Sequence, residues 1–194
     1  MSYQKKDHFY KKAKAENYSA RSVYKLMEIH KKKPVFRSGD LVLDLGCAPG
    51  SWSQYASEEI GPSGKVIGID LQKMDLTLPN ANFILADIND VKWESLFQEY
   101  GIKKNRFDVI LSDMAPRTSG VKSADQARSE QLCEMVLAVA DKLLAESGIL
   151  VFKFFDGPGF QYIRDTAKKQ FKSVSTFRPK STRKASKELF FICR

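Results

Sequence analysis

The stretch LVLDLGCAPGSW, residues 41–52, begins as a run of apolar residues and continues into a turn that contains two glycines and a proline. A helix is expected to begin near Ser51, directly after this turn. A strand, a tight turn and a helix in this order are typical of an open α/β sheet, whose turns hold nucleotide-like ligands. The stretch therefore predicts a ligand-binding turn, and the rest of the chain has to identify the ligand.

Apolar segments and helical patterns alternate after this turn. Residues 125–148 carry apolar side chains at helical spacing and predict the longest helix, which Gly148 is expected to end. Near-continuous apolar strands that alternate with helices indicate a parallel sheet covered on both faces. The expected strands are residues 41–45, 65–70, 81–87, 107–113, 149–155, 172–177 and 188–194, and two further helices are expected at 93–100 and 159–170.

The last two expected strands flank a basic loop and can pair as an antiparallel hairpin. Residues 17–33 predict an additional basic helix before the first strand, with Asn17 or Ser19 as its N-cap. The predicted fold class is α/β, a doubly wound Rossmann-like sheet of about seven strands. A chain of 194 residues suits one core, so we expect a single domain over residues 1–194. Its parts would be a basic N-terminal extension (1–33) and a catalytic core (34–194).

The net charge of +9 is distributed unevenly along the chain. Residues 1–33 contain ten Lys or Arg and three acids, and residues 164–194 contain ten and two. The middle of the chain contains twelve basic and eighteen acidic residues. Two basic ends on a mildly acidic body indicate a phosphate-rich partner, and a nucleic acid is the simplest one.

Several other classes of protein are disfavoured by the composition. No apolar run approaches the roughly 18 to 20 residues that span a membrane, and the N-terminus lacks the apolar segment of a secretory signal. Cys47, Cys133 and Cys193 are far apart, without a CxxC motif or a Cys/His cluster. This pattern predicts neither a disulfide framework nor a metal site. We therefore expect a cytoplasmic monomer that has no membrane contact and binds no metal.

Acidic residues stand near the ends of four expected strands, at Asp44, Asp70, Asp87 and Asp113, and Lys153 lies late in the fifth. Because the carboxyl ends of parallel strands meet at one edge of a sheet, these side chains should surround one site. A single aspartate at a strand end is more often a cap or turn residue. Four such residues together favour a functional site.

The turn does not fit a pyrophosphate. The dinucleotide fingerprint GxGxxG would require glycine at Ala48 and at Ser51, and no Walker A lysine is present. Asp70 follows Gly50 by twenty residues, the usual distance for a carboxylate that binds ribose hydroxyls. Asp87 can then bind an adenine amino group. A site for adenosine without phosphates points to S-adenosyl-L-methionine (SAM).

Five motifs resemble the FtsJ/RlmE family of SAM-dependent RNA ribose 2′-O-methyltransferases. The resemblance covers nearly the whole chain, and the motifs agree with the family in order and spacing. They are ARSVYKLMEI (20–29), DLGCAPGSWSQY (44–55), SDMAP (112–116), VFKFF (151–155) and SKELFF (186–191).

This resemblance implies a class I SAM methyltransferase sheet and a set of functional residues. Trp52 would form a wall of the SAM pocket. The family's SAM contacts fall on Gly50, Trp52, Asp70, Asp87 and Asp113, and we add Gly46 and Pro49 of the same turn. The family's catalytic tetrad falls on Lys25, Asp113, Lys153 and Glu188.

Methylation of a ribose hydroxyl requires that the oxygen is aligned with the methyl group and that its proton is removed. Lys153 is expected to deprotonate or to orient this hydroxyl. The 2′-hydroxyl occurs only in RNA, so RNA is the expected partner. The two basic ends of the chain would form a positive groove across the tetrad. An amino-group methyltransferase is disfavoured, because SDMAP replaces the usual Asn/Asp-Pro-Pro-Tyr.

The resemblance is closest to the bacterial enzymes that modify a uridine in the A-loop of large-subunit (23S-type) ribosomal RNA. A tRNA ribose 2′-O-methyltransferase of the same family stays open, because its turn is equally close. Cys47 and Ser51 stand where alanine and glycine are common in the rRNA branch. A non-catalytic RNA-binding assembly factor that keeps the fold is a second alternative, which the intact tetrad disfavours.

Overall fold

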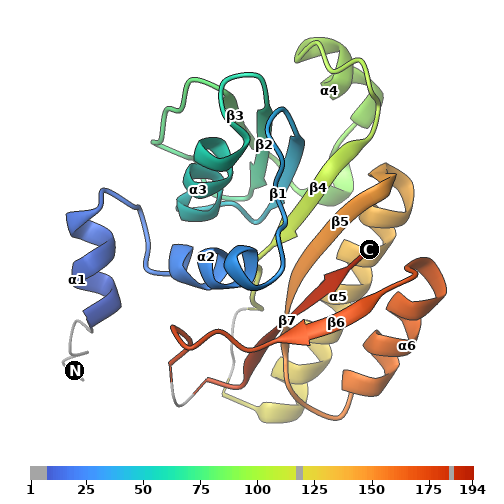
Figure 1. The fold of residues 1–194 in the computed structure, drawn as a ribbon. Coiled ribbons are helices and arrows are strands. Elements are labelled where there is room, and N and C mark those ends of the chain that lie inside the picture. The colour runs from blue at the N-terminus through green and yellow to red at the C-terminus, as the bar shows by residue number, and fades with distance from the viewer. Residues whose placement is uncertain (1–7, 117–119, 184–185) are drawn as a thin grey trace.

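The computed structural model describes residues 8–116, 120–183 and 186–194, which form a seven-stranded sheet in the order β3-β2-β1-β4-β5-β7-β6 (Figure 1). The first five strands pair in parallel, and β7 runs antiparallel to both β5 and β6. The predicted fold class, including the closing hairpin, is confirmed. The strands are β1 Leu41–Leu45, β2 Lys65–Asp70, β3 Ala81–Leu85, β4 Phe107–Ser112, β5 Leu144–Phe155, β6 Val174–Phe177 and β7 Glu188–Cys193.

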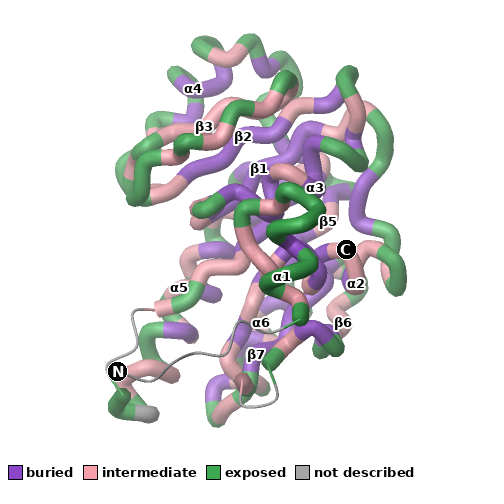
Figure 2. The backbone as a smooth tube through the Cα atoms, turned by 90° about the vertical axis from the view of Figure 1, so that its left-hand side faces the viewer, coloured by how far each residue is buried: buried purple, intermediate pink, exposed green. Residues whose placement is uncertain are grey.

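Helices cover both faces of the sheet because the strands have apolar side chains on both sides. On one face, α2 (Val23–Lys32) and α3 (Ser51–Ile60) pack with the buried residues of one hydrophobic cluster. On the other face, α4 (Trp93–Glu99), α5 (Lys122–Leu143) and α6 (Phe160–Gln170) cover a second cluster. Figure 2 shows the buried strands between these layers. No helix in the described part of the chain is long and apolar enough to cross a membrane.

The N-terminal segment differs from the prediction of one helix over residues 17–33. The structure has two helices, α1 (His8–Ala15) and α2, separated by a turn. Asn17 has a φ of 61°, a left-handed conformation that asparagine tolerates and that ends α1. The expected caps are therefore wrong. The N-cap of α2 is Ser22, and the hydroxyl of Ser19 instead donates to Oε1 of Gln54.

The end of α5 also differs from the prediction. The helix ends at Leu143, and β5 begins at once with Leu144, so Gly148 lies within the strand and does not terminate the helix. Leu144 has extended backbone angles and pairs with Phe107, whereas the next register pair joins Val109 to Ile149. An irregularity in the β4–β5 pairing therefore accommodates the additional residues.

Candidate active site

The turn after β1 forms the floor of the site. Gly46 has a φ of 71°, and its N–H donates to the carbonyl oxygen of Ile69 at 2.8 Å. A Cβ atom at Gly46 would lie 2.2 Å from Cγ of Met114, so a larger residue cannot fit without displacing that side chain. The peptide bond between Ala48 and Pro49 is cis, and Gly50, with a φ of 104°, is the N-cap of α3. Because Gly46 lines the cavity beside this turn and has no side chain, a ligand could approach the backbone closely at this residue.

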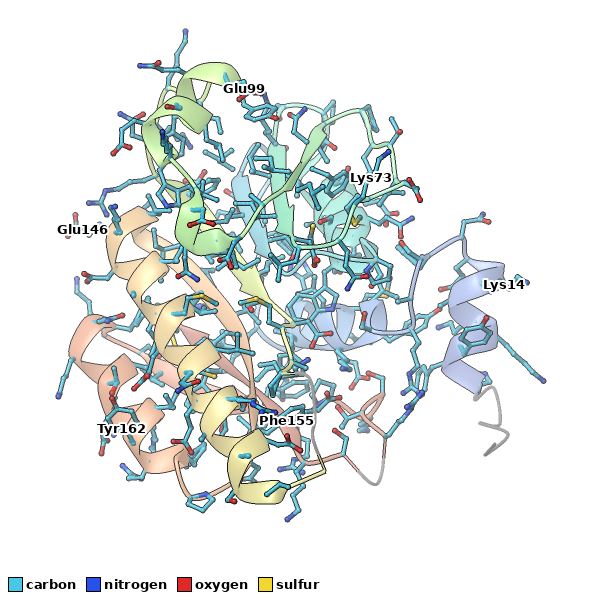
Figure 3. The ribbon with its side chains drawn as sticks, turned by 180° about the vertical axis from the view of Figure 1, so that it is seen from behind. Lys14, Lys73, Glu99, Glu146, Phe155 and Tyr162 are labelled. Carbon is cyan, nitrogen blue, oxygen red and sulfur yellow. The ribbon has the colours of Figure 1, made fainter. Side chains whose placement is uncertain are left out.

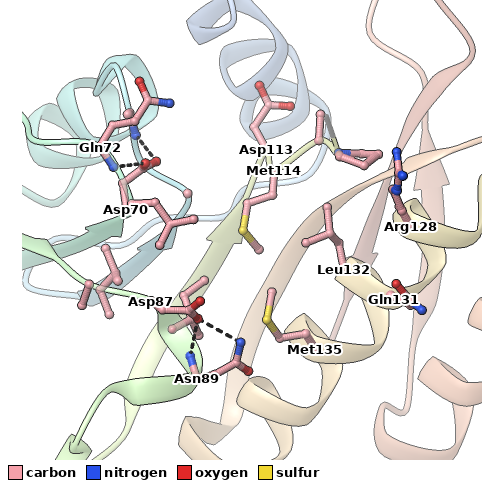
Figure 4. Close-up of a pocket in the computed structure, with 18 residues that line it drawn as sticks. Asp70, Gln72, Asp87, Asn89, Asp113, Met114, Arg128, Gln131, Leu132 and Met135 are labelled. Carbon is pink, nitrogen blue, oxygen red and sulfur yellow. Dashed lines mark hydrogen bonds between the residues drawn. The ribbon is translucent and has the colours of Figure 1, made fainter. Parts of the chain in front are cut away.

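A cavity of about 870 Å³ opens beside this turn, at the carboxyl ends of the parallel strands (Figure 4). Gly46 lines it from the turn after β1, and Asp70 lines it from the end of β2. Asp87 and Asp113 line it from the segments after β3 and β4. Leu132 and Met135 of α5, with Met114, Ile69 and Ile88, supply its apolar surface. The volume and this mixture of apolar walls with a few polar groups are typical of a cofactor site.

Two of the carboxylates are held in place by backbone donors. Asp70 accepts the N–H of Ala48 at 2.9 Å through Oδ2 and the N–H of Gln72 at 2.8 Å through Oδ1. Asp87 accepts both the N–H and the side-chain amide of Asn89 at 2.9 Å through Oδ1. These bonds fix the carboxylates at the cavity surface, where they can accept further hydrogen bonds from a ligand.

The charge of the site suits a cationic cofactor. Asp44, fully buried in β1, has its pKa raised to about 7, first by burial and then by the nearby charges of Asp113 and Asp70, against a hydrogen bond from Ser53 that lowers it. Asp70 and Asp87 place two carboxylates at the cavity surface, which suits a ligand that carries a positive sulfonium group. The residues present therefore fit SAM, with Asp70 and Asp87 as acceptors for the hydroxyl and amino groups of its adenosine.

The predicted cofactor residues fall into two groups. Gly46, Asp70, Asp87 and Asp113 line the cavity. Pro49, Gly50 and Trp52 do not line it.

Our expectation for the ring of Trp52 is wrong, because the ring is 3% exposed and packs in the hydrophobic cluster of α2 and α3. Its centroid lies 5.6 Å from that of Phe190, and its Nε1 donates to the carbonyl oxygen of Ser22 at 2.9 Å.

Residues of α5 also line the cavity, and none of them was among the predicted site residues. Leu132 and Met135 belong to the apolar periodic face of this helix, which predicts burial in the core, but both line the cavity and are only partly buried. Arg128 and Gln131, one turn earlier, line it as well. Helical periodicity identifies the apolar face of α5, yet it does not show that one end of that face extends past the sheet.

The four predicted tetrad residues form one continuous chain of ion pairs. Nζ of Lys25 lies 2.9 Å from Oε1 of Glu188 and 3.7 Å from Oδ2 of Asp113. Nζ of Lys153 lies 3.0 Å from Oδ1 of Asp113 and also donates to the carbonyl oxygen of that residue. Asp113 therefore links the two lysines, and because it also lines the cavity, it joins the tetrad to the cofactor site.

Strand alternation explains why these residues meet. Lys153 in β5 pairs in register with Phe190, and Phe155 pairs with Glu188. Val151 and Phe190 belong to the cluster beneath α2 and α3, so Lys153 and Glu188, two residues along each strand, point to the same face. Lys25 lies in α2, which covers this face of the sheet, and its side chain reaches Glu188. All four side chains are largely buried, with exposed fractions of 7% for Lys153 and at most 19% for the others.

The segment between β6 and β7 is bound to α2 next to the tetrad. The carboxylate of Glu28 accepts the N–H groups of Lys180 and Ser181 at 2.7 and 2.8 Å. The guanidinium of Arg21 donates to the carbonyl oxygen of Ser181. These contacts join Arg21 and α2 to the described part of the β6–β7 segment, although the two are far apart in sequence.

Comparison with known proteins agrees with this geometry. Residues 18–194 match the model of the FtsJ-like methyltransferases. The chain is 48% identical to ribosomal RNA large subunit methyltransferase E of Bdellovibrio bacteriovorus, over 99% of this chain and 97% of the relative. It is 47% identical to the enzyme of the same name from Nitratidesulfovibrio vulgaris, over 97% of this chain and 92% of the relative.

Solved structures share the fold. A Plasmodium falciparum protein assigned to the ribosomal RNA methyltransferases superposes with a TM-score of 0.77 at 29% identity, covering 91% of this chain and 97% of that one. Fibrillarin from Aeropyrum pernix, solved with natively bound SAM, superposes with a TM-score of 0.57 at 15% identity, covering 89% and 76%. The second likeness concerns the fold alone. The protein belongs to the FtsJ-like methyltransferase family, and S-adenosyl-L-methionine is its cofactor.

Proposed function

We propose that the protein methylates the 2′-hydroxyl group of a ribose in large-subunit ribosomal RNA, and that the target is a uridine of the A-loop. The two relatives with near-complete coverage are both named ribosomal RNA large subunit methyltransferase E. These names favour ribosomal RNA over the tRNA alternative that the turn sequence leaves open.

The observation that carries the proposal is the buried chain Glu188–Lys25–Asp113–Lys153 beside the cofactor cavity. Two cations and two carboxylates alternate along it, so the group is neutral as a whole and each charge has a partner. Assembling it requires α2, the end of β4, β5 and β7 together. Such a constellation serves an RNA-binding scaffold no purpose, which argues against the non-catalytic alternative.

Each residue then has a defined task. When bound, SAM supplies a methyl group activated by its sulfonium. Lys153 deprotonates or orients the 2′-hydroxyl, and Asp113 fixes its amine through a carboxylate and a carbonyl oxygen. Lys25, which Glu188 holds at 2.9 Å, provides a second positive group that stabilises negative charge developing on the oxygen. The oxygen–methyl bond would form as the methyl–sulfur bond breaks, and the hydroxyl proton would pass to the neutral amine of Lys153, or to water if Lys153 only orients the hydroxyl.

The arrangement of positive charge supports an RNA substrate. Arg21 of the α1–α2 turn is close enough to Glu188 for their charges to interact, and its guanidinium donates to Ser181 of the β6–β7 segment. We expect Arg21 and the exposed Lys180 to contact phosphates near the target ribose. We place the activity of the protein in the cytoplasm, where ribosomal RNA would be its substrate.

Mass spectrometry of nucleosides from ribosomal RNA and tRNA tests this proposal in cells that lack the protein. We expect the loss of one 2′-O-methyluridine from large-subunit RNA, restored by the wild-type gene. A Lys153→Met variant should not restore it, although purified variant should bind SAM within a few-fold of wild type. Loss of a methyl group from tRNA alone would overturn the substrate assignment, and restoration by Lys153→Met would overturn the role of Lys153.

Replacement of Lys153 by arginine separates its two possible tasks. Arginine keeps a positive donor but does not accept a proton at accessible pH. If Lys153 only orients the hydroxyl, Lys153→Arg should retain much of the methylation rate. If Lys153 removes the proton, the rate should fall by roughly 10²- to 10⁴-fold, the usual effect of losing a general base.

A further inference from the structure

Phe155 is the last residue of β5 and lies beside the tetrad. The alternation of the strand sends Phe154 into the opposite face, where its ring packs with those of Phe160 and Phe191. Phe155 points to the same face as Lys153, and Nζ of Lys153 lies 5.8 Å from the centroid of its ring. Figure 3 labels Phe155 together with Tyr162, which belongs to a different element, α6.

The ring of Phe155 has no role in the core. Among the described residues it belongs to neither hydrophobic cluster, although Phe152 and Phe154 of the same strand are buried in one of them. Phe155 is only partly buried. Core packing therefore does not explain an aromatic residue at this position.

The backbone around Phe155 is nevertheless well fixed. Its N–H donates to the hydroxyl of Ser129 at 3.4 Å, and the N–H of Asp156 donates to the carbonyl oxygen of Lys187 at 2.9 Å. Asp156 also pairs with Arg178 at 2.9 Å. The structure thus presents a partly exposed aromatic ring on a fixed backbone, next to the amine of Lys153.

We propose that Phe155 is a positioning residue whose ring stacks on the base of the target nucleotide; this rests on the RNA ribose methylation proposed above. Single-stranded bases commonly stack on protein aromatic side chains, because every base has a π face. The base and the 2′-hydroxyl are carried by adjacent ribose carbons, so a base stacked on Phe155 holds its own ribose against Lys153. Stacking requires that the target nucleotide is turned out of its helix, which this arrangement would stabilise.

A different role has to be distinguished. The contact with Lys153 could serve only to orient the amine by a cation–π interaction. Both roles predict that Phe155→Ala slows methylation. They differ in whether the loss depends on the presence of a base.

A double-mutant cycle between protein and RNA makes this distinction. The substrate is a large ribosomal subunit reconstituted with a synthetic oligonucleotide that carries the nucleotide identified by mass spectrometry, either intact or as a ribose without its base. Single-turnover rates are measured at saturating SAM for wild type, Phe155→Ala and Phe155→Trp. Tyr162→Ala, which removes an exposed ring on α6, is the matched control.

With the intact nucleotide, Phe155→Ala should lower kcat/KM by roughly 5- to 100-fold, the usual effect of losing one base-stacking side chain. With the base-free ribose it should cause no further loss. Phe155→Trp should retain activity, and Tyr162→Ala should behave as wild type on both RNAs. An equal loss on both RNAs would overturn the stacking role. Failure of the wild-type enzyme on the intact nucleotide would instead overturn the proposed function.

Photocrosslinking keeps the proposal testable if Phe155→Ala fails to fold. Wild-type protein is irradiated with the same subunit carrying 5-iodouridine at the target position, and the crosslinked peptide is identified by mass spectrometry. A crosslink to Phe155 is expected. A crosslink to another aromatic residue would refute the assignment.

Discussion

The buried carboxyl group of Asp44 should make the stability of the protein depend on pH in a defined way. Asp44 is 1% exposed in the centre of the sheet, and its pKa is raised from 3.8 to about 7. The folded state therefore favours the protonated carboxyl, whereas the unfolded chain releases its proton near pH 3.8. The contribution of Asp44 to the free energy of unfolding is therefore largest below the unfolded pKa. It falls as pH rises from about 4 to about 7 and does not change further above that.

The size of this effect follows from the pKa difference. About 3 pH units at about 1.4 kcal/mol each correspond to a loss of about 4 kcal/mol in the free energy of unfolding. About 3 kcal/mol of this loss falls between pH 5 and pH 8. Asp44→Asn removes the titration but keeps an oxygen that can accept the hydrogen bond from Ser53, which spans 2.6 Å.

Urea unfolding of wild type and Asp44→Asn at four pH values between 5 and 8 measures the difference directly. The stability of the variant relative to wild type should rise by about 3 kcal/mol over this range, because the titrations of all other groups cancel. Asp70→Asn removes one of the charges that raise the pKa of Asp44, so it should shift the wild-type transition to lower pH. Parallel pH profiles for wild type and Asp44→Asn would refute the reasoning.

Three further substitutions test the site. Gly46→Ala should weaken SAM binding measured by calorimetry, because alanine at this positive φ costs about 1–2 kcal/mol and its methyl group would collide with Met114. The double variant Gly46→Ala/Met114→Ala should recover part of the lost affinity. If it recovers none, the collision with Met114 is not the cause. Asp87→Asn should lower SAM affinity by roughly 10-fold with an unchanged melting temperature, since this side chain is exposed and an amide oxygen can still accept the hydrogen bonds from Asn89; unchanged affinity would exclude Asp87 from the site. Glu188→Gln should lower kcat while SAM affinity stays the same, because Lys25 is left with Asp113 at 3.7 Å; a large loss of SAM affinity instead would place Glu188 in the cofactor site.

The order of apolar segments was enough to predict the layers of the fold, because a parallel sheet buried on both faces needs continuous apolar strands. Positions at strand ends predicted Asp70, Asp87 and Asp113 for the same reason, since parallel strands end at one edge. The tetrad was accessible through its motifs, and the structure joins its members by ion pairs. The sequence pattern therefore predicted which residues lie at the edge of the sheet where the cavity opens.

Whether these side chains point into the core or into the cavity depends on tertiary packing. A motif cannot show that the ring of Trp52 turns into the core, or that the end of α5 extends past the sheet to line the cavity. The predicted start of α2 was wrong because Asn17 follows a separate helix, α1. The predicted end of α5 was wrong because Leu144 pairs with Phe107 in the sheet, so the helix ends before Gly148. The ion pairs of Lys25 with Glu188 and Asp113 exist only where α2 packs on β7 and the end of β4, since contacts between distant segments arise from packing and not from local periodicity.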